Sequence, residues 1–141
     1  MIDEYAGLIK EEDRLGLELG LSEIIINAIE HGNLEISFDE KVETLKDGMD
    51  ALERLRGSRR GNPDLGRRKV MIESFVGGGS IFWTITDEGG GFDFEKLLDP
   101  NETCNLETPC GRGIFLARMQ FDSLEFSKSG CRVRLGKRFA G

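Results

Sequence analysis

Two runs of alternating side chains, separated by three glycines, constrain the fold of this chain more than any other feature. Residues 70–76 and 80–86 each alternate in hydropathy, and this pattern around a glycine turn predicts a β-hairpin that ends at Asp87. The second strand carries apolar atoms on both faces, with one face made of Ile81, Trp83 and Ile85. A strand of this kind is expected in the middle of a sheet, so other elements must pair with it and cover it.

The C-terminal part supplies a helix and a second hairpin. Ile114, Ala117 and Phe121 recur at three- and four-residue spacing, which predicts a helix over residues 114–121. Residues 124–127 and 131–139 are expected to form a final hairpin, with a core-facing side made of Cys131, Val133 and Leu135. Helices before and between antiparallel hairpins predict an α+β two-layer sandwich, in which helices cover one face of a mixed, mostly antiparallel sheet.

The N-terminal half before the first hairpin is expected to be largely helical. Residues 3–19 are charged with scattered Leu and Ile, and they predict a helix that leads into residues 22–33. Residues 39–56 predict one amphipathic helix, weakened by Gly48 and with a narrow apolar stripe made of Val42, Leu45, Met49, Leu52 and Leu55. Such a stripe either packs on its own domain or faces a partner helix.

Residues 57–69 are expected to form a loop, because Gly, Asn, Pro and Ser interrupt them. With the residue before it, this segment is a basic island on an acidic chain, made of Arg56, Arg59, Arg60, Arg67, Arg68 and Lys69. The island either docks an acidic partner or is a solvated, flexible loop.

Residues 22–33 contain a pair of polar side chains suited to chemistry. Glu23 and Asn27 are four apart, so on a helix they share a face about 6 Å from each other. An amide oxygen can bind Mg²⁺, and a neighbouring carboxylate can orient a hydroxyl or a water. Gly32 is expected to end the helix through a positive φ. Taken alone, such a pair more often marks only a solvated helix face.

Two glycine segments strengthen this candidate. Asp87 stands where a strand opens into a glycine run, and a buried carboxylate there can accept a hydrogen bond from an exocyclic amine such as adenine N6. The alternative is a glycine-rich turn that Asp87 caps. Residues 111–113 precede a helical pattern, so free N–H groups at a helix start would face phosphate oxygens. Arg112 either adds a charge-assisted contact to phosphate or points to solvent.

With Glu23 and Asn27, these segments resemble the N-box and two glycine boxes of the GHKL ATPase superfamily, and most closely its anti-sigma-factor serine/threonine kinase branch. The resemblance runs over residues 15–138. It implies a single Bergerat-type ATP-binding domain over residues 1–141, with an ATP lid at 94–110 and an inserted helical segment and basic loop at 37–69.

The same resemblance implies ATP and Mg²⁺ as cofactors, Asn27 as the metal ligand and Glu23 as the general base. The residues that it places at the nucleotide are Asn27, Asp87, Gly89, Gly91, Gly111, Arg112, Gly113 and Ile114. The chain departs from the family in two places. There is little room before Leu15 for the usual edge strand and longer helix, and Cys131 stands near a position where the family usually carries a Thr that helps to hold adenine.

The function implied is that of a kinase that regulates transcription by partner switching. Its partners would be a STAS-type anti-anti-sigma protein and a sigma factor, and the resemblance also allows a homodimer. Three alternatives stay open: a nucleotide-dependent binding module without significant kinase activity, a histidine-kinase-like catalytic domain, and a domain without nucleotide. The single histidine, His31, is expected to be a helix C-terminal partner or a residue at the rim of the site rather than a phosphoacceptor.

Composition excludes other classes of protein. A net charge of −7 argues against direct binding of nucleic acid, which needs a basic face. No window approaches 18 consecutive apolar residues, and the acidic N-terminus does not resemble a signal peptide, so a cytoplasmic protein without membrane segments is expected. Three cysteines without a CxxC spacing and one histidine predict no zinc site.

Overall fold

The strands of the computed structural model form one antiparallel sheet in the order β1-β2-β4-β3. The structure describes residues 1–91, 112–127 and 129–139. The strands are β1 (Met71–Gly77), β2 (Ser80–Thr86), β3 (Ser123–Phe126) and β4 (Arg132–Arg138). β2 lies between β1 and β4, which confirms the central position predicted from its two apolar faces.

The predicted glycine hairpin is present. Gly77 pairs with Ser80, and the two residues between them, Gly78 and Gly79, have φ of 60° and 77°. Two consecutive positive φ values give the tight turn whose twist matches that of the flanking strands, and glycine reaches them without steric cost. The turn therefore fixes the register of β1 against β2.

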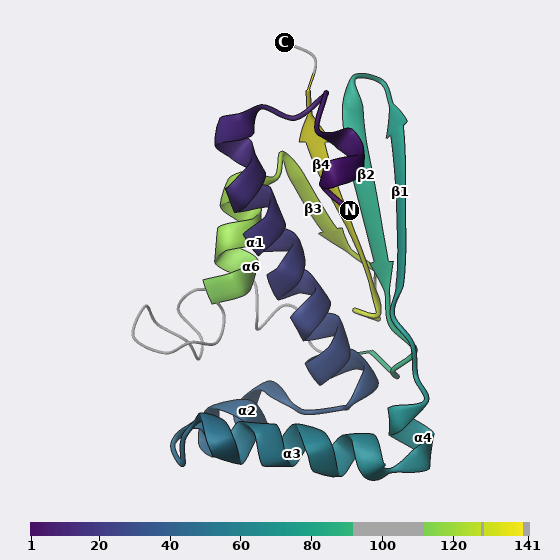
Figure 1. Cartoon of the computed structure of the whole chain (residues 1–141). Helices are drawn as coiled ribbons and strands as arrows, with labels where there is room; N and C mark the ends of the chain where they lie inside the picture. Colours follow the sequence, from purple (N-terminus) through teal and green to yellow (C-terminus); the bar gives the residue numbers. More distant parts are fainter. Residues whose placement is uncertain (92–111, 128, 140–141) are drawn as a thin grey trace.

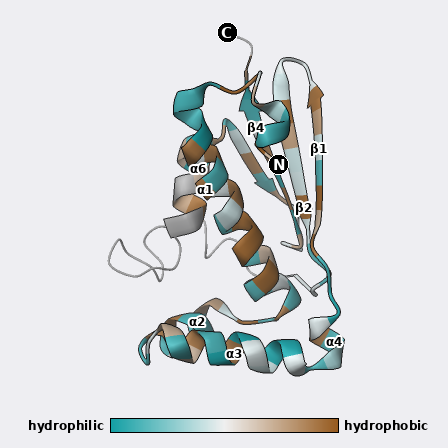
Figure 2. Cartoon of the chain, in the orientation of Figure 1, coloured by the Kyte–Doolittle hydropathy of each residue, from teal (hydrophilic) through white to brown (hydrophobic). Residues whose placement is uncertain are grey.

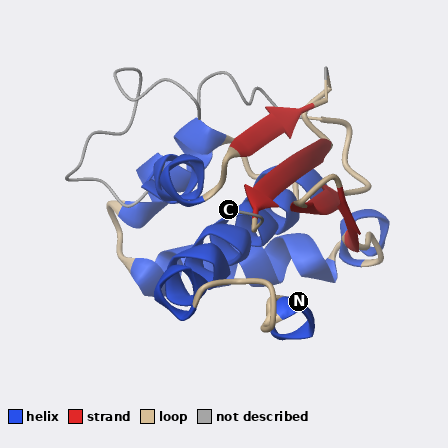
Figure 3. Cartoon of the chain, turned by 90° about the horizontal axis from the view of Figure 1, so that it is seen from above, coloured by secondary structure: helices blue, strands red, loops and turns tan. Residues whose placement is uncertain are grey.

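Two helices cover one face of this sheet. Helix α1 (Glu11–Asn27) and helix α6 (Arg112–Gln120) lie side by side against the strands (Figures 1 and 3). A Cβ on Gly20 of α1 would lie 2.9 Å from the Phe121 ring and 3.3 Å from the Ala117 Cα, so glycine permits this close approach. The predicted stripe of α6 is confirmed, because Ile114, Ala117 and Phe121 are buried.

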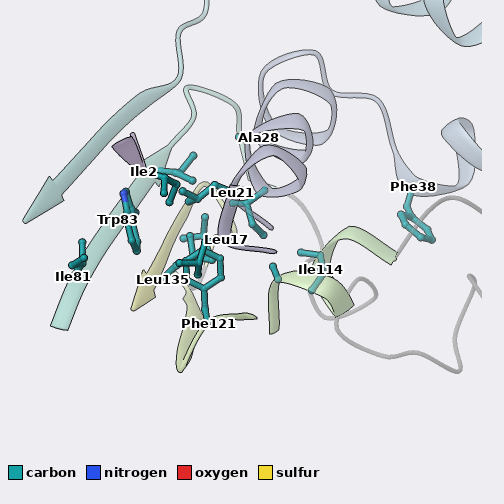
Figure 4. Packing of buried hydrophobic residues seen from close by; sticks show 14 residues of the cluster. Ile2, Leu17, Leu21, Ala28, Phe38, Ile81, Trp83, Ile114, Phe121 and Leu135 are labelled. Atoms are coloured by element: carbon teal, nitrogen blue, oxygen red, sulfur yellow. The ribbon is translucent and has the colours of Figure 1, made fainter. Parts of the chain in front are cut away.

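The core lies between the helices and the sheet (Figure 4). Trp83 of β2 is completely buried, and its ring meets the Phe121 ring edge-on, with centroids 5.7 Å apart. Leu17 and Leu21 of α1 are buried in the same cluster. Figure 2 shows apolar residues along α1, whereas α3 is mostly hydrophilic. The two-layer α+β sandwich predicted from the sequence is confirmed.

The N-terminal segment is less helical than expected. Instead of one helix over residues 3–19, a 3₁₀ turn η1 (Asp3–Tyr5) precedes α1. Ile2 is buried, the Tyr5 ring meets Trp83 edge-on, and the Tyr5 hydroxyl lies 2.5 Å from Ser74 Oγ. This segment packs on the hairpin through side chains and does not pair with β1 as a strand. Among the described residues β1 is therefore an edge strand.

The inserted segment forms three helices: α2 (Phe38–Leu45), α3 (Met49–Gly61) and α4 (Pro63–Gly66). A single helix over 39–56 is wrong, because Gly48 has φ of 98° and separates α2 from α3. The loop expected over 57–69 is also wrong. Asn62 caps α4 by accepting the Asp64 N–H, and Pro63 occupies its first turn. Asn62 and Pro63 are therefore helix-start signals, whereas Gly57 and Ser58 lie inside α3.

The insertion packs on its own domain through part of the predicted stripe. Leu52 is buried, and Leu55 packs against a small second cluster formed by Leu34, Ile36 and Leu65. Half of the basic island is used inside the chain. Arg56, Arg59 and Arg68 pair with carboxylates, whereas the side chains of Arg60 and Arg67 are exposed.

Candidate functional site

Helix α1 continues into a short π-helical segment, η2 (Ala28–Asn33), directly after Asn27. Glu23 and Asn27 both lie in the last part of α1, one turn apart, and both are partly exposed. π-helical segments are rare and frequently occur at functional sites. The prediction that Gly32 ends the helix by a positive φ is wrong, since the segment runs to Asn33 and the residue with positive φ is Glu35, at 52°.

The π segment holds a buried carboxylate. Glu30 is 1% exposed, Lys41 Nζ of α2 lies 2.5 Å from its Oε2, and Arg56 Nε of α3 donates to its Oε1 at 2.9 Å. Burial alone would raise the pKa of Glu30, but the hydrogen bonds and charges of Lys41 and Arg56 outweigh it and hold that pKa below its usual value. One carboxylate therefore joins α2 and α3 to the end of α1.

His31 has a structural position. It is 5% exposed, its Nδ1–H donates to the Ile36 carbonyl oxygen at 2.7 Å, and its ring packs against Phe38. Burial is the main cause that lowers the pKa of His31, so the neutral imidazole is favoured. His31 thus holds the chain that leaves the π segment and does not lie at the rim of the site.

Asp87 begins the glycine turn at the end of β2 and is 5% exposed. Its own N–H donates to the Cys131 carbonyl oxygen at 2.9 Å, and its Oδ1 accepts the Gly89 N–H at 2.9 Å. Burial raises the pKa of Asp87, while the Gly89 hydrogen bond and the charge of Arg68 partly oppose the increase. A buried carboxylate with spare lone pairs is suited to accept a hydrogen bond from a ligand amine.

The π segment and the glycine turn pack backbone to backbone. A Cβ on Gly32 would lie 2.3 Å from the Asp87 carboxyl carbon, and a Cβ on Gly89 would lie 2.1 Å from the Gly32 carbonyl oxygen. Gly91, at φ of 94°, approaches the Ser129 carbonyl oxygen in the same way, with its Cβ position 2.1 Å away. These glycines bring together three segments that are distant in the sequence.

These segments and the end of α1 line a narrow, open pocket whose cavity volume is about 10 Å³, roughly the room that one water needs. Asn27, Asp87 and Cys131 provide its polar groups. Its other lining residues are Ile24, Ala28, Ile85, Phe126, Gly130 and Val133. Apolar walls with a few convergent polar groups are typical of the lining of a ligand site, and this pocket would have to widen to admit a purine ring.

The comparisons with known proteins agree with this geometry. A family model described as a histidine kinase-like ATPase domain matches residues 3–137, which is nearly the whole chain. The chain belongs to this ATPase family. No curated protein and no solved structure matches it. The histidine kinase-like ATPase domain is a GHKL-type ATP-binding module, and its α+β fold is the one described above.

The other site residues predicted from the GHKL resemblance lie in different parts of the fold. Gly89 and Gly91 lie on the Asp87 turn, and Glu23 lies one turn before Asn27 without lining the pocket. Ile114 is 1% exposed, so its side chain belongs to the core. Arg112 and Gly113 are in the first turn of α6, whereas the sequence placed them just before this helix, and Gly111 and the lid at 94–110 lie outside the described residues.

The residues of this ATPase domain fit ATP and Mg²⁺. Asp87, which lines the apolar pocket, suits the exocyclic amine of adenine. Gly32 and Gly89 pack so closely on its carboxylate that a side chain at either position would clash. Among the described residues, no group of three or more His, Cys, Asp or Glu could hold a metal ion. The amide oxygen of Asn27 is a hard ligand of the kind that Mg²⁺ takes, and Mg²⁺ commonly uses one or two protein ligands and completes its shell with phosphates and water.

Sequence reasoning missed the contacts that support the Asp87 turn. Asn33 Oδ1 accepts the Glu88 N–H at 2.7 Å, and Glu88 Oε2 accepts the Lys69 N–H at 2.8 Å. Arg68 Nη1 donates to the Asn33 carbonyl oxygen at 3.0 Å. The sequence places Arg68 in a basic island that either docks an acidic partner or is a solvated loop, because nothing local distinguishes it from the neighbouring arginines. None of the helices among the described residues is long and apolar enough to span a membrane.

Proposed function

We propose that this ATPase domain is an ATP- and Mg²⁺-dependent serine/threonine protein kinase of the anti-sigma type, which regulates transcription by partner switching with a STAS-type anti-anti-sigma protein. The observation that carries the proposal is the convergence of Asn27 and Asp87 on one pocket, with Glu23 one helical turn from Asn27. The N-box and glycine boxes that resemble the anti-sigma kinase branch support the choice of substrate class. A sigma factor as a second partner, a homodimer and a cytoplasmic location belong to the same proposal.

Each residue has a distinct task in this mechanism. Asp87 accepts the adenine amine, and the turn at Gly89 and Gly91 lets the backbone approach the base and sugar. Asn27 would hold Mg²⁺ through its amide oxygen, and that ion, when bound, neutralises phosphate charge. Glu23 orients the acceptor serine hydroxyl and takes its proton. Phosphoryl transfer needs mainly positioning and charge neutralisation, so one carboxylate beside one amide is sufficient protein chemistry.

The test is transfer of label from γ-labelled ATP to a STAS-domain protein. The native chain is expected to label a serine or threonine, and Glu23→Gln to reduce the rate at least 100-fold while ATP still binds. Glu12→Gln is the matched control, since Glu12 lies in the first turn of the same helix, far along α1 from Asn27. Undiminished transfer in Glu23→Gln would refute the assignment of the base.

A second candidate is a nucleotide-dependent binding module with little chemistry, in which ATP controls docking of a partner. The observation that favours it is Cys131 in the pocket, because a thiol is a weaker hydrogen-bonding group than the usual hydroxyl. Tight ATP binding without label transfer would support this candidate. Acid-labile label on a histidine of a partner would support the histidine-kinase-like alternative instead.

A further inference from the structure

Arg68 stands at the end of the inserted segment and contacts the residues that support the Asp87 turn. Its Nη1 donates to the Asn33 carbonyl oxygen at 3.0 Å and lies 3.1 Å from Glu35 Oε2. The Arg68 side chain is only 24% exposed. It therefore bridges two residues at the end of the π segment.

Asn33 passes this restraint to the glycine turn. The Asn33 residue is 4% exposed, and its Oδ1 accepts the Glu88 N–H, next to Asp87 in the chain. The Glu88 carboxylate also contacts the insertion, since it accepts the Lys69 N–H at 2.8 Å. Residues 68–69 therefore restrain the turn that carries Asp87 at two groups of Glu88. Arg68 acts on the Glu88 N–H through Asn33, and the Lys69 N–H binds the Glu88 carboxylate. The charge of Arg68 also acts on Asp87, since it opposes the rise in the pKa of that carboxyl caused by burial.

The folding of the insertion fixes where Arg68 lies. Asn62 caps the short helix α4, and Leu65 of that helix is buried against Leu34 and Ile36 beside the π segment. Arg68 follows α4 directly, and its N–H donates to the Leu65 carbonyl oxygen at 3.2 Å. The backbone at Arg68 is therefore held by packing and a backbone hydrogen bond, independently of the contact between its side chain and Asn33.

We propose that Arg68 is a positioning residue for adenine recognition, which holds Asn33 and through it the Asp87 turn so that the carboxylate faces the amine of the base. This role rests on the ATP site proposed above. By this proposal the insertion becomes part of the nucleotide site, because its residue Arg68 helps to fix the position of Asp87, which binds the base. Arg68 does not touch the nucleotide in this scheme.

The test compares ATP with inosine triphosphate, whose base carries a carbonyl in place of the amine that would donate a hydrogen bond to Asp87. Calorimetry with Mg²⁺ gives the dissociation constants of both nucleotides for the native chain, Arg68→Met and Arg67→Met. We expect the native chain to prefer ATP by roughly tenfold or more, since a buried acceptor is left unpaired by the carbonyl base. Arg68→Met should reduce this preference about fivefold or more by weakening ATP, with inosine triphosphate changed less than about twofold.

Arg67→Met is the matched control, because Arg67 is the adjacent arginine and is exposed. It should keep the native preference. Arg68→Lys retains the charge and hydrogen-bond donors but not the planar guanidinium, so its preference should fall between those of the native chain and Arg68→Met. Thermal melts of each variant show whether it folds. If Arg68→Met does not fold, Arg68→Lys decides by the same ratio.

An unchanged preference in a folded Arg68→Met would overturn the proposal, as would an equal loss for both nucleotides, which indicates a general structural role. A native preference in Arg68→Lys would overturn it when Arg68→Met fails to fold. A native chain that binds neither nucleotide would refute the ATP site itself. That result is distinct from tight ATP binding with an unaltered preference in the variant.

Discussion

Replacing Glu30 by Gln tests the ion pairs of Glu30 with Lys41 and Arg56, which join the segment after α1 to the insertion. The carboxylate is 1% exposed, and the side chains of its partners Lys41 and Arg56 are 13% and 19% exposed. Removing one member of a buried ion pair typically costs about 3–5 kcal/mol, because the remaining charge stays buried and unpaired. Both cations here can partly reach water, so we expect a loss of about 2–4 kcal/mol in the free energy of unfolding.

The assay is urea unfolding followed by circular dichroism, together with a thermal melt. A loss of about 3 kcal/mol corresponds to a decrease in Tm of roughly 10 °C for a domain of this size. Glu53→Gln is the matched control, since Glu53 pairs with the same Arg56 but is 61% exposed. Its expected cost is below about 1 kcal/mol. Equal losses in the two variants would refute the reasoning.

Glu30 also gives the stability of the native chain a pH dependence with a defined sign. Its pKa is lower in the folded chain than its usual value of 4.5, so the unfolded chain binds the proton more readily. The stabilisation is complete above that usual value and is lost as the pH falls through the folded-state pKa. Glu30→Gln should therefore lose less stability than the native chain when the pH falls below about 4.5.

Four further variants test the turn that carries Asp87 and the glycines. Gly32→Ala places a Cβ 2.3 Å from the Asp87 carboxyl carbon and should weaken ATP binding by roughly tenfold or more in calorimetry, whereas unaltered affinity would contradict the close packing. Asp87→Asn removes a carboxylate whose pKa is raised by burial, so the Tm at pH 7 should not fall, while ATP affinity decreases; a large fall in Tm would count against this account. Gly57→Ala, inside α3 with no atom within 4 Å of its Cβ position, should stabilise the chain by about 0.5–1 kcal/mol. Gly48→Ala, at φ of 98°, should destabilise it by about 1 kcal/mol, and urea unfolding that gave both alanine variants the same sign would refute the assignment of these two glycines.

The sheet and the helix that closes it could be predicted because their signals are local. Alternation of apolar side chains around Gly78 and Gly79 defines the β1–β2 hairpin, and the spacing of Ile114, Ala117 and Phe121 defines the buried side of α6. The insertion was predicted less well. The Asn62-Pro63 pair marks a helix start as readily as a loop, and a glycine such as Gly57 can lie inside a helix. Packing of Leu65 on Leu34 and Ile36 decides between these outcomes.

The candidate site, too, could be predicted from the sequence only in part. The residue types at Glu23, Asn27 and Asp87 and their order in the chain are sufficient to suggest the chemistry, because an amide, a carboxylate and a glycine turn have the same preferences in any fold. The π-helical segment, the burial of Glu30 and the contact of Arg68 with Asn33 arise between residues that are distant in the sequence. No local pattern encodes such contacts, since whether a charged side chain meets solvent or a carbonyl oxygen depends on what the rest of the chain packs beside it.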